Sequence, residues 1–184
     1  MALVLDGTNG VSLVQDGVIT SAKIADGTIA AADLAAGAIT SGALPAGSVL
    51  QVVMDTDSTE RTVSNTTFID SGLSQAITPS STSSKILVVV SQSGVYSHTS
   101  GSQKQYRLLR NSTEIVRIED VMFDGLADDL GQQIGYSYLD SPATTSEITY
   151  KTQFANRGGS QSFSVNHYGS VALSSSLILM EIAG

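Results

Sequence analysis

The first fifty residues carry an aliphatic side chain at every fifth position, and we call this series the aliphatic ladder. Its members are Val14, Ile19, Ile24, Ile29, Leu34, Ile39, Leu44 and Val49. Glycines recur at twice that spacing, at Gly7, Gly17, Gly27, Gly37 and Gly47. A spacing of five matches neither the 3.6-residue period of an α-helix nor the two-residue period of a strand. The segment is therefore predicted to alternate between turns and short extended pieces.

One repeat unit, TSAKIADG, indicates how that alternation works. Ser21 is predicted to cap a single helical turn. Asp26 and Gly27 then close the turn through a left-handed residue, and Thr28 and Ile29 follow in extended form.

Burial of the ladder requires partners. Ordering each residue costs about 1 kcal/mol or more, and a buried aliphatic side chain contributes roughly 2 kcal/mol. Burial of one aliphatic side chain in every five residues therefore cannot offset the free-energy cost of ordering a single chain. Parallel copies in register about a common axis would bury the ladder and leave Asp, Thr and Ser outside. A flexible Gly/Ala/Ser linker has no need of evenly spaced aliphatics, and a single-chain pentapeptide solenoid needs more coils than this. We therefore predict a stalk over residues 1–47.

Residues 48–184 are predicted to form a separate head. No aromatic residue precedes Phe68, and all ten Phe and Tyr follow from there. Strands are predicted at 49–54, 66–69, 75–78, 85–96, 105–109, 114–119, 133–139, 147–154, 162–166 and 171–182. A hairpin is expected to turn at Asn111 and Ser112. Many short strands without a long helix indicate a mainly β chain whose head is an antiparallel β-sandwich of the jelly-roll kind.

Composition excludes several functions. The formal net charge is −8 with nine Lys and Arg, so a nucleic-acid backbone would be repelled. The absence of Cys rules out disulfides and thiolate zinc sites. The longest apolar run, 86–90, is too short to cross a bilayer, and the N-terminal residues do not form a secretory signal. No nucleic-acid partner, membrane insertion or export signal is expected.

Several segments resemble bacteriophage tail-fibre and virion-appendage proteins, notably those of marine and cyanobacterial phages. They are MALVLDGTNGV, the DGxIT and AADLAAGAIT repeats, ITPSSTSSKILVVVS, YRLLRNSTEI, SYLDSPATTSEITYKTQF and LILMEIAG. The resemblance implies a homotrimeric fibre with the ladder on its axis, an N-terminal end attached to other virion proteins of the tail, baseplate or capsid, and a head displayed outward. It places the protein in the virion, made in the host cytoplasm.

Chemistry-bearing residues are few. Tyr96, His98, His167 and Tyr168 are predicted to help form a receptor surface, because aromatic rings stack on sugar faces and are favoured at interfaces. The alternative is that both histidines are ordinary exposed turn residues. No G-x-S-x-G elbow frames a serine, so no catalytic residue is predicted. No nucleotide-binding glycine motif is present either, and no cofactor is expected.

An acidic stretch invites a calcium interpretation, but its spacing lacks the D-x-D-x-D-G arrangement. Its members are Glu119, Asp120, Asp124, Asp128 and Asp129. A solvated acidic loop is the simpler interpretation, and no metal site is predicted.

Three hypotheses follow. The first is a host-recognition fibre whose head binds a cell-surface glycan or protein. The second is a purely structural virion component, such as a capsid decoration or a fibre connector, without receptor binding. The third is polysaccharide cleavage, which would need two carboxylates across a sugar-binding cleft; we predict that the protein is not an enzyme.

Overall fold

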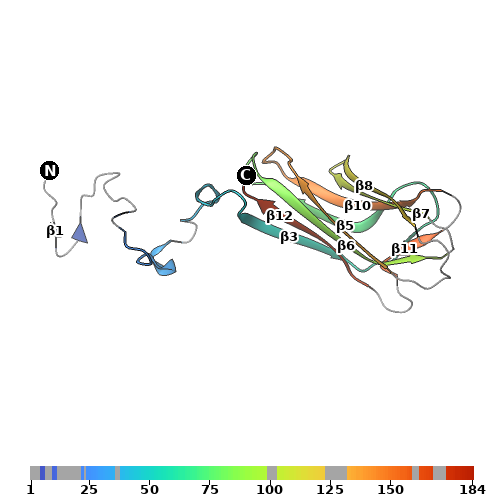
Figure 1. Cartoon of the computed structure of the whole chain (residues 1–184), viewed down its shortest axis with the longest axis horizontal. Coiled ribbons are helices and arrows are strands. Elements are labelled where there is room, and N and C mark those ends of the chain that lie inside the picture. The colour runs from blue at the N-terminus through green and yellow to red at the C-terminus, as the bar shows by residue number, and fades with distance from the viewer. Residues whose placement is uncertain are drawn as a thin grey trace. The chain divides into compact units, whose positions relative to one another are not determined.

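The computed structural model describes residues 5–6, 10–11, 22, 24–35, 38–98, 103–122, 132–158, 162–167 and 173–184. The chain divides into two units, Met1–Ala43 and Leu44–Gly184, which are described separately (Figure 1). In the part of the chain so described, no helix is long and apolar enough to cross a membrane.

The described residues of the first unit contain little regular structure. Strands β1 (Leu5–Asp6) and β2 (Gly10–Val11) pair antiparallel. Two short 3₁₀ helices follow at Ala31–Asp33 and Ser41–Ala43. Val14 and Ile19 of the aliphatic ladder lie outside the described residues, and Ile24 is its first described member.

A tight turn recurs every five residues, directly after each described ladder residue from Ile24 to Leu44. The amides of Thr28, Asp33, Ala38, Ala43 and Ser48 donate to the carbonyls of Ala25, Ala30, Ala35, Thr40 and Pro45, at 2.9–3.1 Å. The turns after Ile24 and Leu44 have Gly27 (φ 78°) and Gly47 (φ 89°) as their third residue. Type II turns require a positive φ there, which glycine adopts without strain. The predicted left-handed conformation of Gly27 is confirmed, and the 3₁₀ helices at Ala31–Asp33 and Ser41–Ala43 lie between the two glycine turns.

The second unit, which we call the head, is mainly β and contains two antiparallel sheets (Figure 1). The six-stranded sheet has the order β3-β12-β6-β9, with β11 and β4 continuing beside the last residues of β6. Its strands are β3 (Val49–Asp57), β4 (Arg61–Val63), β6 (Lys85–Ser97), β9 (Gln132–Asp140), β11 (Phe163–Val165) and β12 (Ser175–Ile182). The four-stranded sheet has the order β5-β10-β7-β8. Its strands are β5 (Ile69–Ile77), β7 (Gln103–Arg110), β8 (Thr113–Met122) and β10 (Ile148–Asn156).

Most predicted strands coincide with observed ones, but the strand predicted at 66–69 is wrong. The backbone bends there because the side chain of Asn65 accepts a hydrogen bond from the amide of Thr67 at 2.9 Å. The extended conformation starts only at Ile69, and it runs through the region predicted at 75–78 as one strand, β5. Gly72 allows this continuity with a φ of 102°, opposite a register shift in β10.

Alternating side chains from both sheets build the core. In β6, Ile86, Val88 and Val90 are at most 2% exposed. The larger cluster of buried residues comprises Leu73, Ile77, Ile86, Val88, Val90, Leu108, Ile148, Tyr150, Leu177 and Leu179. A second cluster, richer in aromatic rings, comprises Val63, Val95, Tyr106, Phe154, Phe163 and Val165. Burial of these side chains at roughly 2 kcal/mol each is the main force that holds the two sheets together.

Two buried carboxylates link strands to neighbouring elements through hydrogen bonds. Asp140, at the end of β9, accepts hydrogen bonds from Arg110 at 2.8–2.9 Å and from the Tyr150 hydroxyl at 2.6 Å, which links the two sheets. Glu181 accepts hydrogen bonds from Gln51 at 2.6 Å and from Ser80 at 2.7 Å. Burial alone would raise the pKa of Glu181, but the hydrogen bonds outweigh burial and lower it.

Candidate functional site

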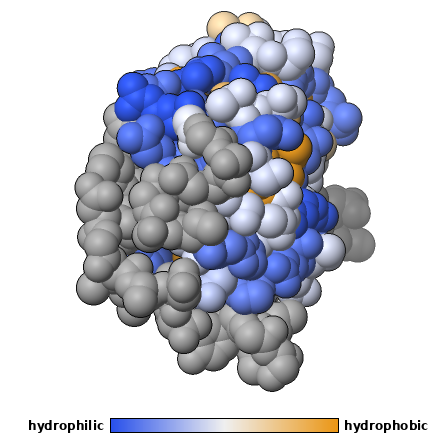
Figure 2. Space-filling model, turned by 90° about the vertical axis from the view of Figure 1, so that its right-hand side faces the viewer, coloured by the Kyte–Doolittle hydropathy of each residue, from blue (hydrophilic) through white to orange (hydrophobic). Residues whose placement is uncertain are grey.

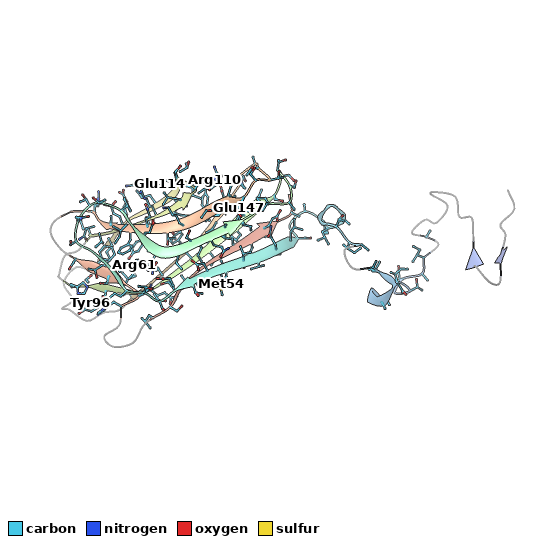
Figure 3. The ribbon with its side chains drawn as sticks, turned by 180° about the vertical axis from the view of Figure 1, so that it is seen from behind. Met54, Arg61, Tyr96, Arg110, Glu114 and Glu147 are labelled. Atoms are coloured by element: carbon cyan, nitrogen blue, oxygen red, sulfur yellow. The ribbon has the colours of Figure 1, made fainter. Side chains whose placement is uncertain are left out.

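The candidate site lies at the end of the head opposite the start of β3. Both β3 and β6 pair antiparallel with β12, so they run in the same direction. Val49 and Lys85 each lie beside Ile182 at one end, and Tyr96 lies at the other (Figure 3). Figure 2 looks onto this second end, where the described residues present mostly hydrophilic side chains. The site therefore lies at the opposite end of the head from Val49, where the repeat segment (residues 1–47) joins the sheet.

Three aromatic rings from distant parts of the sequence meet at this end. Tyr96 lies near the end of β6, His98 directly follows that strand, and His167 follows β11. The Tyr96 ring centroid lies 5.0 Å from that of His98 and 4.5 Å from that of His167, and the two imidazoles are 5.5 Å apart. His98 is exposed, whereas Tyr96 and His167 are half-buried. We call these three residues the ring cluster; Tyr168, the fourth predicted receptor residue, lies outside the described residues.

A glycine in β6 positions His167. Gly94 has a φ of 58°, and its carbonyl accepts a hydrogen bond from the amide of His167 at 3.0 Å. The neighbouring amide of Asn166 donates to the carbonyl of Ser93 at 3.0 Å. A Cβ at Gly94 would stand 2.5 Å from the backbone nitrogen of His167, which is closer than real contacts allow. Only glycine lets the two backbones approach this closely.

Polar side chains hold both imidazoles. Nε2 of His98 lies 2.6 Å from the hydroxyl of Ser164, which in turn lies 2.7 Å from that of Thr62. Nδ1 of His167 lies 2.8 Å from Oε1 of Glu60. Contact with His167 holds the pKa of the Glu60 carboxyl below its ordinary value, against a smaller opposing effect of burial. Glu60 therefore places a carboxylate at the edge of the ring cluster.

The pair of Ser164 and His98 has the spacing of a nucleophile and its base, but its surroundings do not suit catalysis. Ser164 is 0% exposed, within β11, and its hydroxyl also contacts Thr62. A substrate outside the protein cannot reach that oxygen in this conformation. The serine instead fixes the orientation of the exposed imidazole.

A metal site is also not formed by the residues that the structure describes, because no group of three or more His, Asp or Glu side chains converges there. Of the predicted acidic stretch, Glu119 faces Arg117 at 3.5 Å. Asp124, Asp128 and Asp129 lie outside the described residues, as does the side chain of Asp120.

No protein family matches the chain, and no curated protein matches its sequence. Among solved structures, the chain is similar to T=1 particles derived from infectious bursal virus, with 13% identity and a TM-score of 0.43. That match covers 73% of this chain and 36% of the other. It is similar also to the VP2 subviral particle of infectious bursal disease virus, with 14% identity and a TM-score of 0.41, over 73% of this chain and 38% of the other.

The chain thus spans little more than a third of these two structures. Sequence identity this low carries no conclusion about what the chain does. The resemblance of the sequence motifs to phage tail-fibre proteins stays a prediction.

The described members of the aliphatic ladder are exposed in the single chain. The exposed fractions are 40% for Ile24, 54% for Ile29, 42% for Leu34, 54% for Ile39, 39% for Leu44 and 52% for Val49. Val14 and Ile19 lie outside the residues whose side chains the structure describes.

Sequence reasoning identified the rings of the site but missed the polar residues that hold them. Glu60, Thr62 and Ser164 carry no motif, and they reach the histidines only because β4 and β11 pair beside the end of β6. The one available signal was Gly94, a glycine inside an otherwise regular strand pattern, which is typical of a bulge or a close backbone approach.

Proposed function

We propose that the protein is a homotrimeric virion fibre protein that recognises a host cell surface through the far end of its head. The observation that carries this proposal is the exposure of the aliphatic ladder, 39–54% at each described position. Evenly spaced apolar side chains in an acidic segment without aromatic residues are explained by burial against identical chains. The motif resemblance to phage fibres supports three copies and a location in the virion.

The strand order supports a jelly-roll form for the head. The orders β3-β12-β6-β9 and β5-β10-β7-β8 are those of two interlocked Greek keys, in which the chain crosses repeatedly between two four-stranded layers. Jelly rolls of this kind occur in viral and lectin domains. In this arrangement β4 and β11 are short additions at the far end, where they support the ring cluster.

The ring cluster suits recognition of a glycan or a protein surface. Its rings offer flat faces for stacking, and Glu60 and the imidazoles offer hydrogen-bonding groups around them. Because the cluster lies opposite the start of β3, a head attached through its repeat segment presents it outward. Three copies on one fibre would raise a weak single-site affinity by avidity. We propose binding rather than catalysis, supported by the burial of Ser164.

Binding to cells of the bacterial host tests this proposal. The assembled wild-type chain is expected to bind, and the His98→Ala variant is expected to bind at least about tenfold more weakly, as loss of a contact residue does. Thr113→Ala, an exposed substitution on β8, is the matched control and should bind as the wild type does. Equal binding of all three proteins would exclude the ring cluster as the binding site. No binding by a folded, assembled wild type would favour a purely structural virion role.

A further inference from the structure

The two outer faces of the head differ in chemistry. On the sheet that contains β5, β7, β8 and β10, a row of cross-strand neighbours consists of Arg117, Arg107, Gln153 and Asp70. Arg107 donates to Gln153 at 2.8 Å, and Gln153 donates to Asp70 at 2.6 Å. Both arginines also pair with Glu114, at 3.1 and 2.6 Å. This face is a satisfied polar surface that suits contact with water.

The outer face of the other sheet is apolar. Its corresponding row of cross-strand neighbours consists of Val52, Met180, Leu87 and Leu139, one from each of β3, β12, β6 and β9. The adjacent row contains Met54, Ile178 and Val89. We call these seven residues the apolar sheet face. Its most exposed members are Met54 at 58%, Val52 at 55% and Leu139 at 49%. Figure 3 shows Met54 and Glu114 on opposite layers of the head.

No acidic side chain belongs to the apolar sheet face along β3, β6, β9 and β12, whose residues are all described. Strand alternation turns the acidic residues of these strands inward: Asp140 is 5% exposed and Glu181 1% exposed. The whole chain has a formal net charge of −8, so two copies repel each other over most of their surface. An acid-free apolar face is where that repulsion is smallest and the hydrophobic gain is largest.

The apolar sheet face shares strand β3 with the last residue of the aliphatic ladder. Val49 is both the last ladder residue and the first residue of β3, the edge strand that also carries Val52 and Met54. Leu44 and Val49 are exposed by 39% and 52% within the same unit as this sheet. Two apolar surfaces that meet at one residue are most simply covered by the same neighbour.

We propose that a second copy of this chain covers the apolar sheet face, so that the assembly interface extends from the repeat segment onto the β3 side of the head. This inference rests on the proposed self-association of the chain. The occupant is a second copy because the ladder repeats identically in each chain and a copy brings a matching acid-free face. The charged row on the other sheet then remains in solvent.

Thiol labelling tests this interface, since the chain has no native cysteine. Met54→Cys places a single thiol on the apolar sheet face, and Thr113→Cys places a matched thiol at an exposed position of the opposite sheet. Both positions are exposed in the single chain, so neither substitution disturbs the core. We expect the Met54→Cys thiol of the full, assembled chain to react with a maleimide at least about tenfold more slowly than the Thr113→Cys thiol, because its labelling requires the interface to open.

Sedimentation of the same samples separates the possible failures. Assembled chains with equally fast labelling at both positions would overturn the proposed face and leave self-association standing. Sedimentation as single chains would overturn the proposed assembly and the face together. Assembled chains with slow labelling only at position 54 would support both.

Discussion

Gly94 is the residue on which the geometry of the ring cluster most depends. Its φ of 58° and its approach to the backbone of His167 leave no space for a side chain. We expect Gly94→Ala to destabilise the head by about 1–3 kcal/mol and to displace His167. Gly135→Ala in β9 is the control, since a Cβ there meets only the carbonyl of Val90 at 3.7 Å. Urea unfolding would measure both, and equal stabilities would contradict the proposed role of Gly94.

Lys104 introduces a pH dependence into the stability of the head. Burial lowers its pKa from 10.5 to about 8, and its ammonium lies 5.7 Å from the ring centroid of Phe163. Between pH 8 and 10.5 the unfolded chain binds a proton at Lys104 that the folded chain does not, so this residue's contribution to stability rises with pH. We expect the wild type to gain on the order of 2–3 kcal/mol over this range relative to Lys104→Met.

The measurement is the free energy of unfolding of both proteins at pH 7.5, 9 and 10.5. Tyrosine ionisation affects both alike and cancels in the difference. A constant difference across this range would show that the lysine is not held in a desolvating site.

At the scale of elements, the turn residue Asn111 links the β7–β8 hairpin to the neighbouring strand β10. Asn111 has a φ of 54°, its side chain accepts from the amide of Thr149 at 3.0 Å, and its own amide donates to the Thr149 carbonyl at 2.7 Å. We expect Asn111→Ala to cost about 1–2 kcal/mol, because alanine tolerates this φ poorly and lacks the oxygen. Ser112→Ala, at the adjacent exposed turn position, should change thermal stability by less than about 0.5 kcal/mol.

The strands were largely predictable because their signal is local. The strand predicted at 85–96 matches β6 closely, and alternation between apolar and polar residues identified β10 to within a few residues. The turn at Asn111 and Ser112 was predicted from its residues alone. Strand β4 was missed because Arg61–Val63 is too short for a pattern. The segment at 66–69 was assigned wrongly because its apolar content outweighed the turn formed by Asn65.

The site was predictable only in part. The rings were selected by residue type, but their meeting depends on β11 lying between β4 and β6, and long-range pairing leaves no trace in local sequence. The apolar sheet face could not be predicted from the sequence for a related reason. Leu87 and Val89 belong to the same apolar run as the core residues Ile86, Val88 and Val90, and only the sheet shows which of them point outward.

At the scale of the whole molecule, the ladder is expected to control assembly. Ile29→Asp would place a charge among apolar side chains on the proposed axis, and we expect it to weaken association by at least about a hundredfold, since an unpaired buried charge costs several kcal/mol. Ala32→Asp adds the same charge at an exposed position off the ladder and should leave association nearly unchanged. Equal effects of the two substitutions would show that net charge, not ladder burial, governs assembly.

Sedimentation equilibrium of the full-length wild-type chain over a dilution series tests the central claim most directly. The exposed ladder requires partners, so we expect the mass of three chains, maintained on dilution into the low micromolar range. A mass of 19.1 kDa, that of one chain, with the repeat segment still ordered, would contradict it.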